Sequence, residues 1–173
     1  PKKGIGVEFH TLSAGFLLSQ NQPMTIRFPF ENSDASILIE PAITYNTSSS
    51  KINYNSNYSN FGYRQEDQET SSTVWGLGLG IFKSTYKNKM RSYWGLKIGK
   101  SWTEAEQTGL EDYDFEELLW GPTVGAEYFF DEHFSFGVDA TYLNTSSEDE
   151  QEAYTQTNKA SATTYALLVR FYY

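Results

Sequence analysis

The sequence contains no cysteine, which excludes disulfides, thiolate nucleophiles and cysteine-ligated metals. It also lacks any apolar run near the ~18 residues that a membrane-spanning helix needs, since the longest are stretches such as 166–169. Basic residues are few: 13 Lys and Arg stand against 22 Asp and Glu, a formal net charge of -9. A polyanion would be repelled, so nucleic-acid binding is set aside.

The length of 173 residues suits one domain, and we expect residues 1–173 to form it. The start, Pro1-Lys2-Lys3, is basic but no continuous apolar segment follows it. We therefore expect the numbering to begin after a removed secretion signal. The mean hydropathy of -0.54 argues against a helical membrane protein, but a transmembrane barrel escapes that test because every second strand residue can be polar.

Apolar residues recur with a period of two. Trp75, Leu77, Leu79 and Ile81 alternate with three glycines, and the stretches 93–99 and 134–142 alternate in the same way. A strand sorts such residues onto two faces, whereas a helix would scatter them around its axis. The pattern predicts an all-β chain.

Short polar links alternate with long ones, which is typical of a barrel with short periplasmic turns and long outer loops. The short links are 31–35, 87–90 and 131–133; the long ones are 48–71, 104–114 and 144–156. Strands are expected near 4–14, 24–30, 36–48, 72–86, 91–105, 116–130, 134–145 and 157–173. The sequence thus predicts an eight-stranded antiparallel up-and-down transmembrane β-barrel with both termini on the periplasmic side. The first hairpin is the least defined, because 15–23 could be its loop and Pro29 lacks an amide donor.

The less apolar face combines glycine with isolated charges. Glycine weakens a solvated strand but relieves crowding inside a narrow barrel, and charges enclosed there must pair. A soluble barrel of the lipocalin kind, with the apolar face inside, is the alternative. The charges expected to form a lumenal network are Glu8, Arg27, Glu40, Lys97, Glu127, Asp139 and Arg170.

The apolar face is expected to meet lipid, with aromatic residues near the strand ends as in interfacial girdles. On two strands this face is formed by Ile37, Ile39, Pro41, Ile43 and Tyr45, and by Trp120, Pro122, Val124, Ala126, Tyr128 and Phe130. Lys83 and Lys100 fall on the same face, and they fit it only near strand ends, where their side chains can reach the interface.

The last strand carries five apolar or aromatic residues at every second position up to a terminal aromatic: Tyr165, Leu167, Val169, Phe171 and Tyr173. This resembles the C-terminal assembly signal of outer-membrane barrels. The chain as a whole is similar to the small eight-stranded barrels typified by OmpX and the membrane domain of OmpA. The resemblance implies an outer-membrane location in a Gram-negative bacterium and recognition by the barrel-assembly machinery. It does not set a function, because that group is functionally mixed.

Little in the sequence suggests catalysis. His133 falls in a short turn, and His10 shares a face with Glu8 and is interpreted as a hydrogen-bonded lumenal residue. A lipid-modifying enzyme would need an outward nucleophile and base, and no outward His beside an outward Ser is found. We therefore expect a non-enzymatic protein; a lipid-modifying enzyme remains an alternative.

Acidic stretches lie in or beside three of the expected outer loops: 66–69, 111–117 and 148–152. Carboxylates suit Ca²⁺ or Mg²⁺, so weak binding of these ions is a hypothesis, but no calcium-loop spacing is present and no other cofactor is expected. The expected partners are outer-membrane lipid and lipopolysaccharide, the assembly machinery and an unidentified surface protein. Eight strands leave a lumen filled by side chains, so a diffusion pore is not expected.

Overall fold

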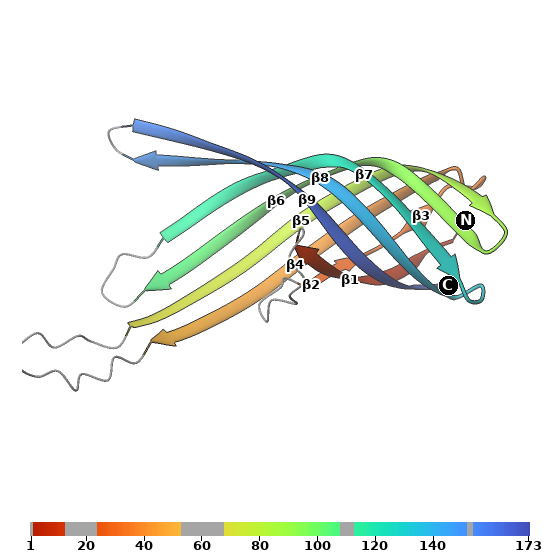
Figure 1. Cartoon of the computed structure of the whole chain (residues 1–173), viewed down its shortest axis with the longest axis horizontal. Helices are drawn as coiled ribbons and strands as arrows, with labels where there is room; N and C mark the ends of the chain where they lie inside the picture. The colour runs from red at the N-terminus through yellow and green to blue at the C-terminus, as the bar shows by residue number, and fades with distance from the viewer. Residues whose placement is uncertain (1, 13–23, 53–67, 108–112, 152–153) are drawn as a thin grey trace, which may run out of the picture.

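The computed structural model describes residues 2–12, 24–52, 68–107, 113–151 and 154–173, and these residues form an all-β structure (Figure 1). They contain no helix that is long and apolar enough to cross a membrane. The strands are β1 (Gly4–Leu12), β2 (Met24–Arg27), β3 (Phe30–Glu31), β4 (Ile37–Ile52), β5 (Gln68–Lys87), β6 (Met90–Gln107), β7 (Tyr113–Phe129), β8 (Phe134–Gln151) and β9 (Tyr154–Tyr172).

The strands close into a single antiparallel barrel. Each strand from β4 to β8 pairs with the strand that follows it in the chain. β9 then pairs with β1, β1 pairs with β2, and β2 pairs with β4, which closes the barrel. β2 and β3 keep one register against β4, so they are two parts of one strand, interrupted at Phe28 and Pro29. Pro29 has no amide to donate, which explains the interruption. Counting β2 and β3 as one, the barrel has eight strands, as predicted.

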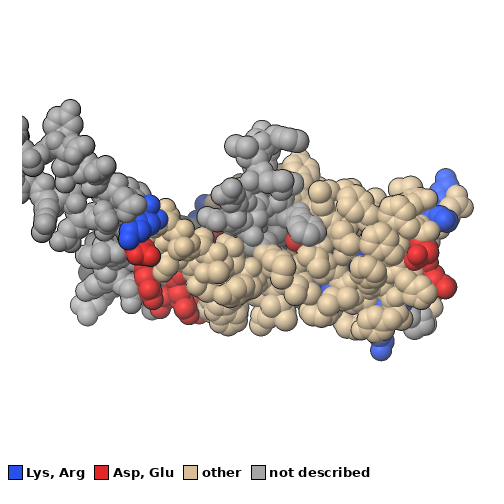
Figure 2. Space-filling model, turned by 90° about the horizontal axis from the view of Figure 1, so that it is seen from below, with Lys and Arg blue, Asp and Glu red and all other residues tan. Residues whose placement is uncertain are grey.

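Side chains that alternate along the strands face opposite sides of the wall. Val124 on β7 is 61% exposed on the outside, whereas its neighbour Thr123 is buried inside. The predicted outer face is confirmed on both β4 and β7, where every second residue is exposed or half-buried. On the surface seen in Figure 2, charged side chains gather toward the two ends, and the part between them is largely uncharged. These faces contradict the soluble alternative, in which the apolar side chains would fill the interior.

The two lysines on the outer face lie toward the ends of the apolar belt. Lys83 pairs with Ile37, the first residue of β4. Lys100 lies two residues from Trp102, which belongs to a row of outward aromatics with Trp75 and Tyr45. Both positions allow the ammonium group to reach the interface, as the predicted register requires.

Short turns and both termini lie at one end of the barrel, here called the short-turn end (Figure 1). The predicted short links are confirmed there, and two of these turns contain a residue with positive φ, Ala35 (56°) and Asn88 (58°). Asn88 is one of the residue types that tolerate this backbone region.

At the opposite end the strands run much further than predicted. Residues 49–52, 68–71, 106–107 and 146–151 were expected to lie in loops, yet they belong to β4, β5, β6 and β8. The prediction was wrong because it looked for an apolar face, and strands beyond the belt need none. Their ladders are held by backbone hydrogen bonds, and residues with hydroxyl side chains lie opposite each other, as Ser49 opposite Ser71 and Ser50 opposite Thr70. Residues 15–23, where the loop of the first hairpin was expected, lie outside the described residues, as do 13 and 14 at the end of the predicted first strand.

Candidate functional site

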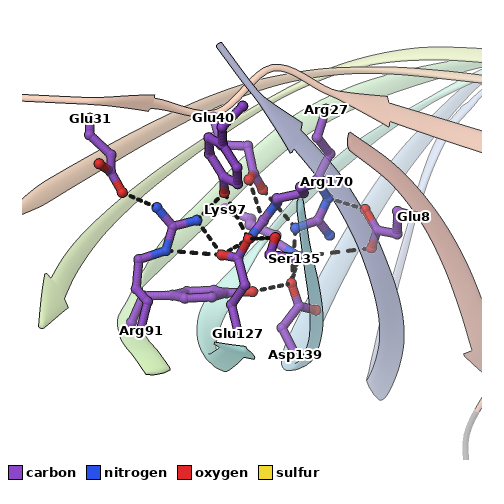
Figure 3. A network of polar contacts seen from close by, with 12 residues as sticks. Glu8, Arg27, Glu31, Glu40, Arg91, Lys97, Glu127, Ser135, Asp139 and Arg170 are labelled. Carbon is purple, nitrogen blue, oxygen red and sulfur yellow. Dashed lines mark hydrogen bonds and ion pairs between the residues drawn. The ribbon is translucent and has the colours of Figure 1, made fainter. Parts of the chain in front are cut away.

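A network of buried ion pairs fills the half of the lumen nearer the short-turn end (Figure 3). It begins at Arg27 on β2. The guanidinium of Arg27 contacts Glu8 on β1, lies 2.7 Å from Glu40 on β4 and 2.9 Å from Asp139 on β8. One arginine thus connects three strands other than its own across the barrel.

Arg170 on β9 extends the network toward the short-turn end. One of its terminal nitrogens pairs with Glu40, and the other lies 2.8 Å from Glu127 on β7. Arg91 on β6 reaches the same Glu127 through its Nε at 2.9 Å, and it also pairs with Glu31 on β3. Tyr172 donates its hydroxyl to Glu127 at 2.8 Å. Glu127 is therefore the common acceptor of two arginines and a tyrosine.

Lys97 marks the other limit of the network. Its ammonium lies 3.0 Å from Asp139, and its side chain is 21% exposed, whereas the arginine side chains are almost fully buried. Farther from the short turns, inward residues such as Thr44, Ser101 and Leu143 are half-buried rather than buried. The lumen is thus closed between Lys97 and the short-turn end, and it is more accessible between Lys97 and the opposite end.

The buried charges nearly balance. Among the described residues the network joins four cations, Arg27, Arg91, Lys97 and Arg170, to five carboxylates, Glu8, Glu31, Glu40, Glu127 and Asp139. A further ammonium lies at the short-turn end, where Lys2 sits 4.4 Å from the centre of the Phe129 ring. Arg91 lies 5.5 Å from the centre of the same ring. Lys2 thus adds a positive charge at the short-turn end of the lumen, beside the ring that Arg91 also faces.

The structure brings together all seven charged residues that the sequence suggested for the lumen. It adds Glu31 and Arg91, which sequence reasoning missed. Arg91 lies an even number of residues from Tyr93 and Lys97, so it is on the same inward face of β6. The alternation along this strand could therefore have placed it in the lumen. Glu31 lies in a two-residue strand beyond Pro29, where no alternation can be recognised. Such a network neutralises charge and links strands, and truncating one partner of a buried pair is strongly destabilising.

An aromatic and ionic cluster lies on the outer surface where the apolar belt ends. Trp75 and Trp102 stack with their ring centres 4.2 Å apart. Trp102 donates its indole N–H to Glu116 at 2.9 Å, and Lys100 pairs with the same carboxylate. Amphipathic rings and a nearby charge pair are typical of a membrane–water interface.

The five residues of the expected assembly signal follow the outer face of β9 and the residue after it. Phe171 is 55% exposed and Tyr173 is 80% exposed, and Val169 is half-buried. β9 pairs with β8 on one edge and with β1 on the other, so it contributes to the seam that joins the two ends of the chain.

The acidic stretches lie on strands where they are described. Glu69 is on β5, Asp114, Glu116 and Glu117 are on β7, and 148–151 are on β8. Residues 66–67, 111–112 and 152 lie outside the described residues. Within the described part, no three or more His, Asp or Glu side chains are placed to hold a metal ion.

Of the two histidines, the structure describes the side chain of His133 alone. His133 is exposed in the turn before β8, as predicted, with its ring nitrogen 4.0 Å from Glu132. His10 pairs with Ala166 in the ladder between β1 and β9, and its side chain lies outside the described part.

Comparisons with known proteins identify the fold. No protein-family model and no curated protein sequence matches the chain. Among solved structures, Neisserial surface protein A is similar with a TM-score of 0.55 and 11% identity, over 98% of this chain and 94% of that protein. A major outer membrane protein of Thermus thermophilus gives a TM-score of 0.54 and 10% identity, over 99% of each chain.

A third structure is Ail, the attachment invasion locus protein of Yersinia pestis, in complex with a heparin analogue. It gives a TM-score of 0.50 and 8% identity, over 99% of this chain and 95% of that one. At such low identity the likeness establishes the fold alone. The chain has the fold of the small outer-membrane β-barrels.

Proposed function

We propose that this chain is an integral protein of the outer membrane of a Gram-negative bacterium, with a non-enzymatic structural or surface-interaction role carried by the outer parts of β4 to β9. The observation that supports this most is the reversed distribution of polarity. Val124, Leu96 and Ile43 are at least half exposed on the outside, while Arg91 and Arg170 are fully buried inside. Water cannot solvate a surface of this kind favourably, but a bilayer can.

The filled lumen supports a role other than diffusion. Three arginines and their carboxylates occupy the half of the lumen next to the short turns, where a pore would have to pass. An eight-stranded barrel leaves room for little more than side chains. We expect no stable conductance when the folded protein is added to planar bilayers.

Lipid and lipopolysaccharide are the proposed surroundings of the belt and its outer edge. The cluster of Trp102, Lys100 and Glu116 supports this, because it combines a ring and a charge pair at the level where head groups lie. The barrel-assembly machinery is the proposed partner of the outward residues of β9.

Weak binding of Ca²⁺ or Mg²⁺ by the acidic stretches stays a prediction. Titration calorimetry of the folded protein in detergent tests it, and the absence of both heat and a thermal shift would retire it. A lipid-modifying activity stays an alternative with a simple test. We expect His10→Ala to leave any lipid-dependent phenotype unchanged, and loss of such an activity would favour the enzyme.

The absence of cysteine makes the orientation directly testable. Ser49→Cys places a thiol on the exposed outer part of β4, and Ser33→Cys places one in an exposed turn at the short-turn end. A membrane-impermeant maleimide should label the first variant on intact cells and the second only after the envelope is opened. Labelling of Ser33→Cys on intact cells, with Ser49→Cys protected, would reverse the proposed orientation.

A further inference from the structure

The barrel wall divides at its outer end between β7 and β8. The β6–β7 ladder continues to Ala105 opposite Tyr113, and the β8–β9 ladder continues to Gln151 opposite Tyr154. The ladder between β7 and β8 ends earlier, at Glu117 opposite Ser147. Beyond this pair the β8–β9 hairpin separates from β7 (Figure 1). We call this division the fork; its edges are 113–116 on β7 and 148–151 on β8.

The fork begins where the next pair would oppose two carboxylates. If the register of Glu117 and Ser147 continued, Glu116 would lie opposite Glu148. Two residues further, Asp114 would lie opposite Glu150. Like charges directly opposite each other on one face of a sheet are destabilising.

The neighbouring strand makes this repulsion stronger. Asp114 already lies opposite Glu104 in the β6–β7 ladder. A closed fork would therefore align three carboxylates in one row across β6, β7 and β8. In the adjacent row, nearer the apolar belt, Lys100 and the indole N–H of Trp102 contact Glu116 and offset part of its charge. The repulsion in a closed fork is therefore greatest in the row of Glu104, Asp114 and Glu150. The sequence thus explains why the wall closes up to Glu117 and stays open beyond it.

The open fork presents two strand edges to the outside. Within the described residues, the backbone groups along 113–116 and 148–151 that face the fork have no ladder partner. An extended chain can add to such an edge through main-chain hydrogen bonds, and its side chains then decide which chain is accepted. Here the residues along both edges are mostly acidic: Asp114 and Glu116 on β7, and Glu148, Asp149 and Glu150 on β8.

We propose that the fork is a binding site for an extended, basic segment of a protein partner, which adds as a strand to the β8 edge. Lys or Arg at every second position of that segment would lie opposite Glu148 and Glu150 on one side and near Asp114 and Glu116 on the other. This attraction would replace the carboxylate–carboxylate repulsion expected if the two edges came together. This site deepens the proposed surface role and rests on it, since the fork must face the outside of the cell.

A synthetic peptide of alternating Lys and Thr tests the site on the full chain folded in zwitterionic detergent, with a peptide of alternating Glu and Thr as its counterpart. We expect only the basic peptide to bind, with an affinity that falls as salt is added, and to slow amide hydrogen exchange at 113–116 and 148–151. Binding of both peptides, or binding without protection of these amides, would overturn the proposal.

Two variants with equal loss of charge separate the fork from general attraction to an acidic protein. Glu148→Gln with Glu150→Gln should weaken binding about tenfold, as expected when two charge pairs are lost, and should protect the fork amides even without peptide. Glu69→Gln with Glu106→Gln removes two carboxylates from β5 and β6, away from the fork, and should leave the affinity within about twofold. If both double variants weakened peptide binding equally, the result would contradict a binding site at the fork. Heat-dependent mobility of each variant in electrophoresis, measured in parallel, reports whether the barrel itself is folded, so a failure of the barrel is distinguished from a failure of the fork.

Discussion

Gly125 on β7 lies against the ring of Tyr93 on β6, so closely that a Cβ on the glycine would overlap the aromatic carbons. Gly80 on β5 has the same relationship with the ring of Phe82. The two rings are neighbours, with centres 5.3 Å apart, and both are buried in the lumen. The glycines of the inner face therefore make room for large side chains that close the barrel beside the ion pairs.

Adding a methyl group at either glycine is expected to destabilise the barrel. Gly125→Ala or Gly80→Ala forces a packed ring to move, which typically costs about 1–3 kcal/mol. Gly78→Ala is the matched control, because its new Cβ would lie 3.6 Å from Ala42 Cβ and 3.7 Å from the Ile98 carbonyl oxygen, which are ordinary contacts. Urea unfolding in detergent micelles measures the difference. Equal effects at Gly78 and Gly125 would mean that the rings do not fill the lumen in this way.

Removing Arg170 is expected to destabilise the folded state by about 3–5 kcal/mol, because Glu40 and Glu127 stay buried with less compensation. Arg170→Met keeps much of the side-chain volume, so the loss reports charge rather than a cavity. The same unfolding experiment provides the measurement.

Two further variants identify the cause of that loss. Arg170→Met combined with Glu40→Gln restores the balance of charge and should recover part of the stability. Lys100→Met breaks an exposed pair on the outer surface and should leave the unfolding midpoint almost unchanged. If Arg170→Met lowered the free energy of unfolding as little as Lys100→Met, the result would contradict a structural role for the network.

Asp131 gives the short turn before β8 a dependence on pH. Its carboxylate accepts the backbone N–H of His133 at 2.8 Å and that of Phe134 at 2.7 Å, and these bonds hold the pKa of Asp131 below its usual value. A lowered pKa in the folded state stabilises the protein at neutral pH, and this contribution disappears as the pH falls through that pKa. Asp131→Ala should therefore be less stable than the native chain at pH 7, and the gap should narrow below about pH 4. A gap that stays constant with pH would show that the bonds do not depend on the charge.

The outward aromatics of β9 are expected to matter more for assembly in cells than for stability. Phe171→Ser should lower the amount of folded barrel in the outer membrane, while refolding of the purified chain in detergent should change little. Phe134→Ser is the matched control, because the Phe134 ring packs 5.1 Å from that of Phe171 but belongs to β8. Quantifying the heat-shifted band from membrane fractions distinguishes the two. Equal losses for both variants would attribute the effect to packing and not to a signal in the last strand.

Alternation in the sequence was enough to predict the barrel and most of its interior. Glu40, Glu127 and Asp139 each lie in an apolar or glycine-rich strand, at one of the alternate positions that face inward. Their location in the lumen could therefore be predicted from the alternation alone. Their actual partners did not, because an arginine such as Arg27 reaches across the barrel to strands far away in the sequence. Which carboxylate it meets depends on the tilt and stagger of the strands, and periodicity carries no information on these.

The outer ends of the strands could not be recognised from hydrophobic pattern. Ser49, Ser50 and Thr70 are strand residues without any apolar neighbour to alternate with, so their composition suggested a loop. What holds them is pairing across strands, which depends on the register set inside the membrane. The position of the fork could not be predicted either, because it depends on the register that would place Glu116 opposite Glu148.

The central claim is that the apolar outer face is in contact with lipid, and a spin label at Val124 tests it most directly. Val124→Cys is compared with Ser49→Cys and Ser33→Cys, each the single cysteine of its variant, after folding into lipid vesicles. We predict that the label at Val124 is more accessible to oxygen, which concentrates in the bilayer, than to a water-soluble nickel complex, and that the other two labels show the reverse. A label at Val124 as accessible to the nickel complex as the one at Ser49 would contradict the membrane barrel.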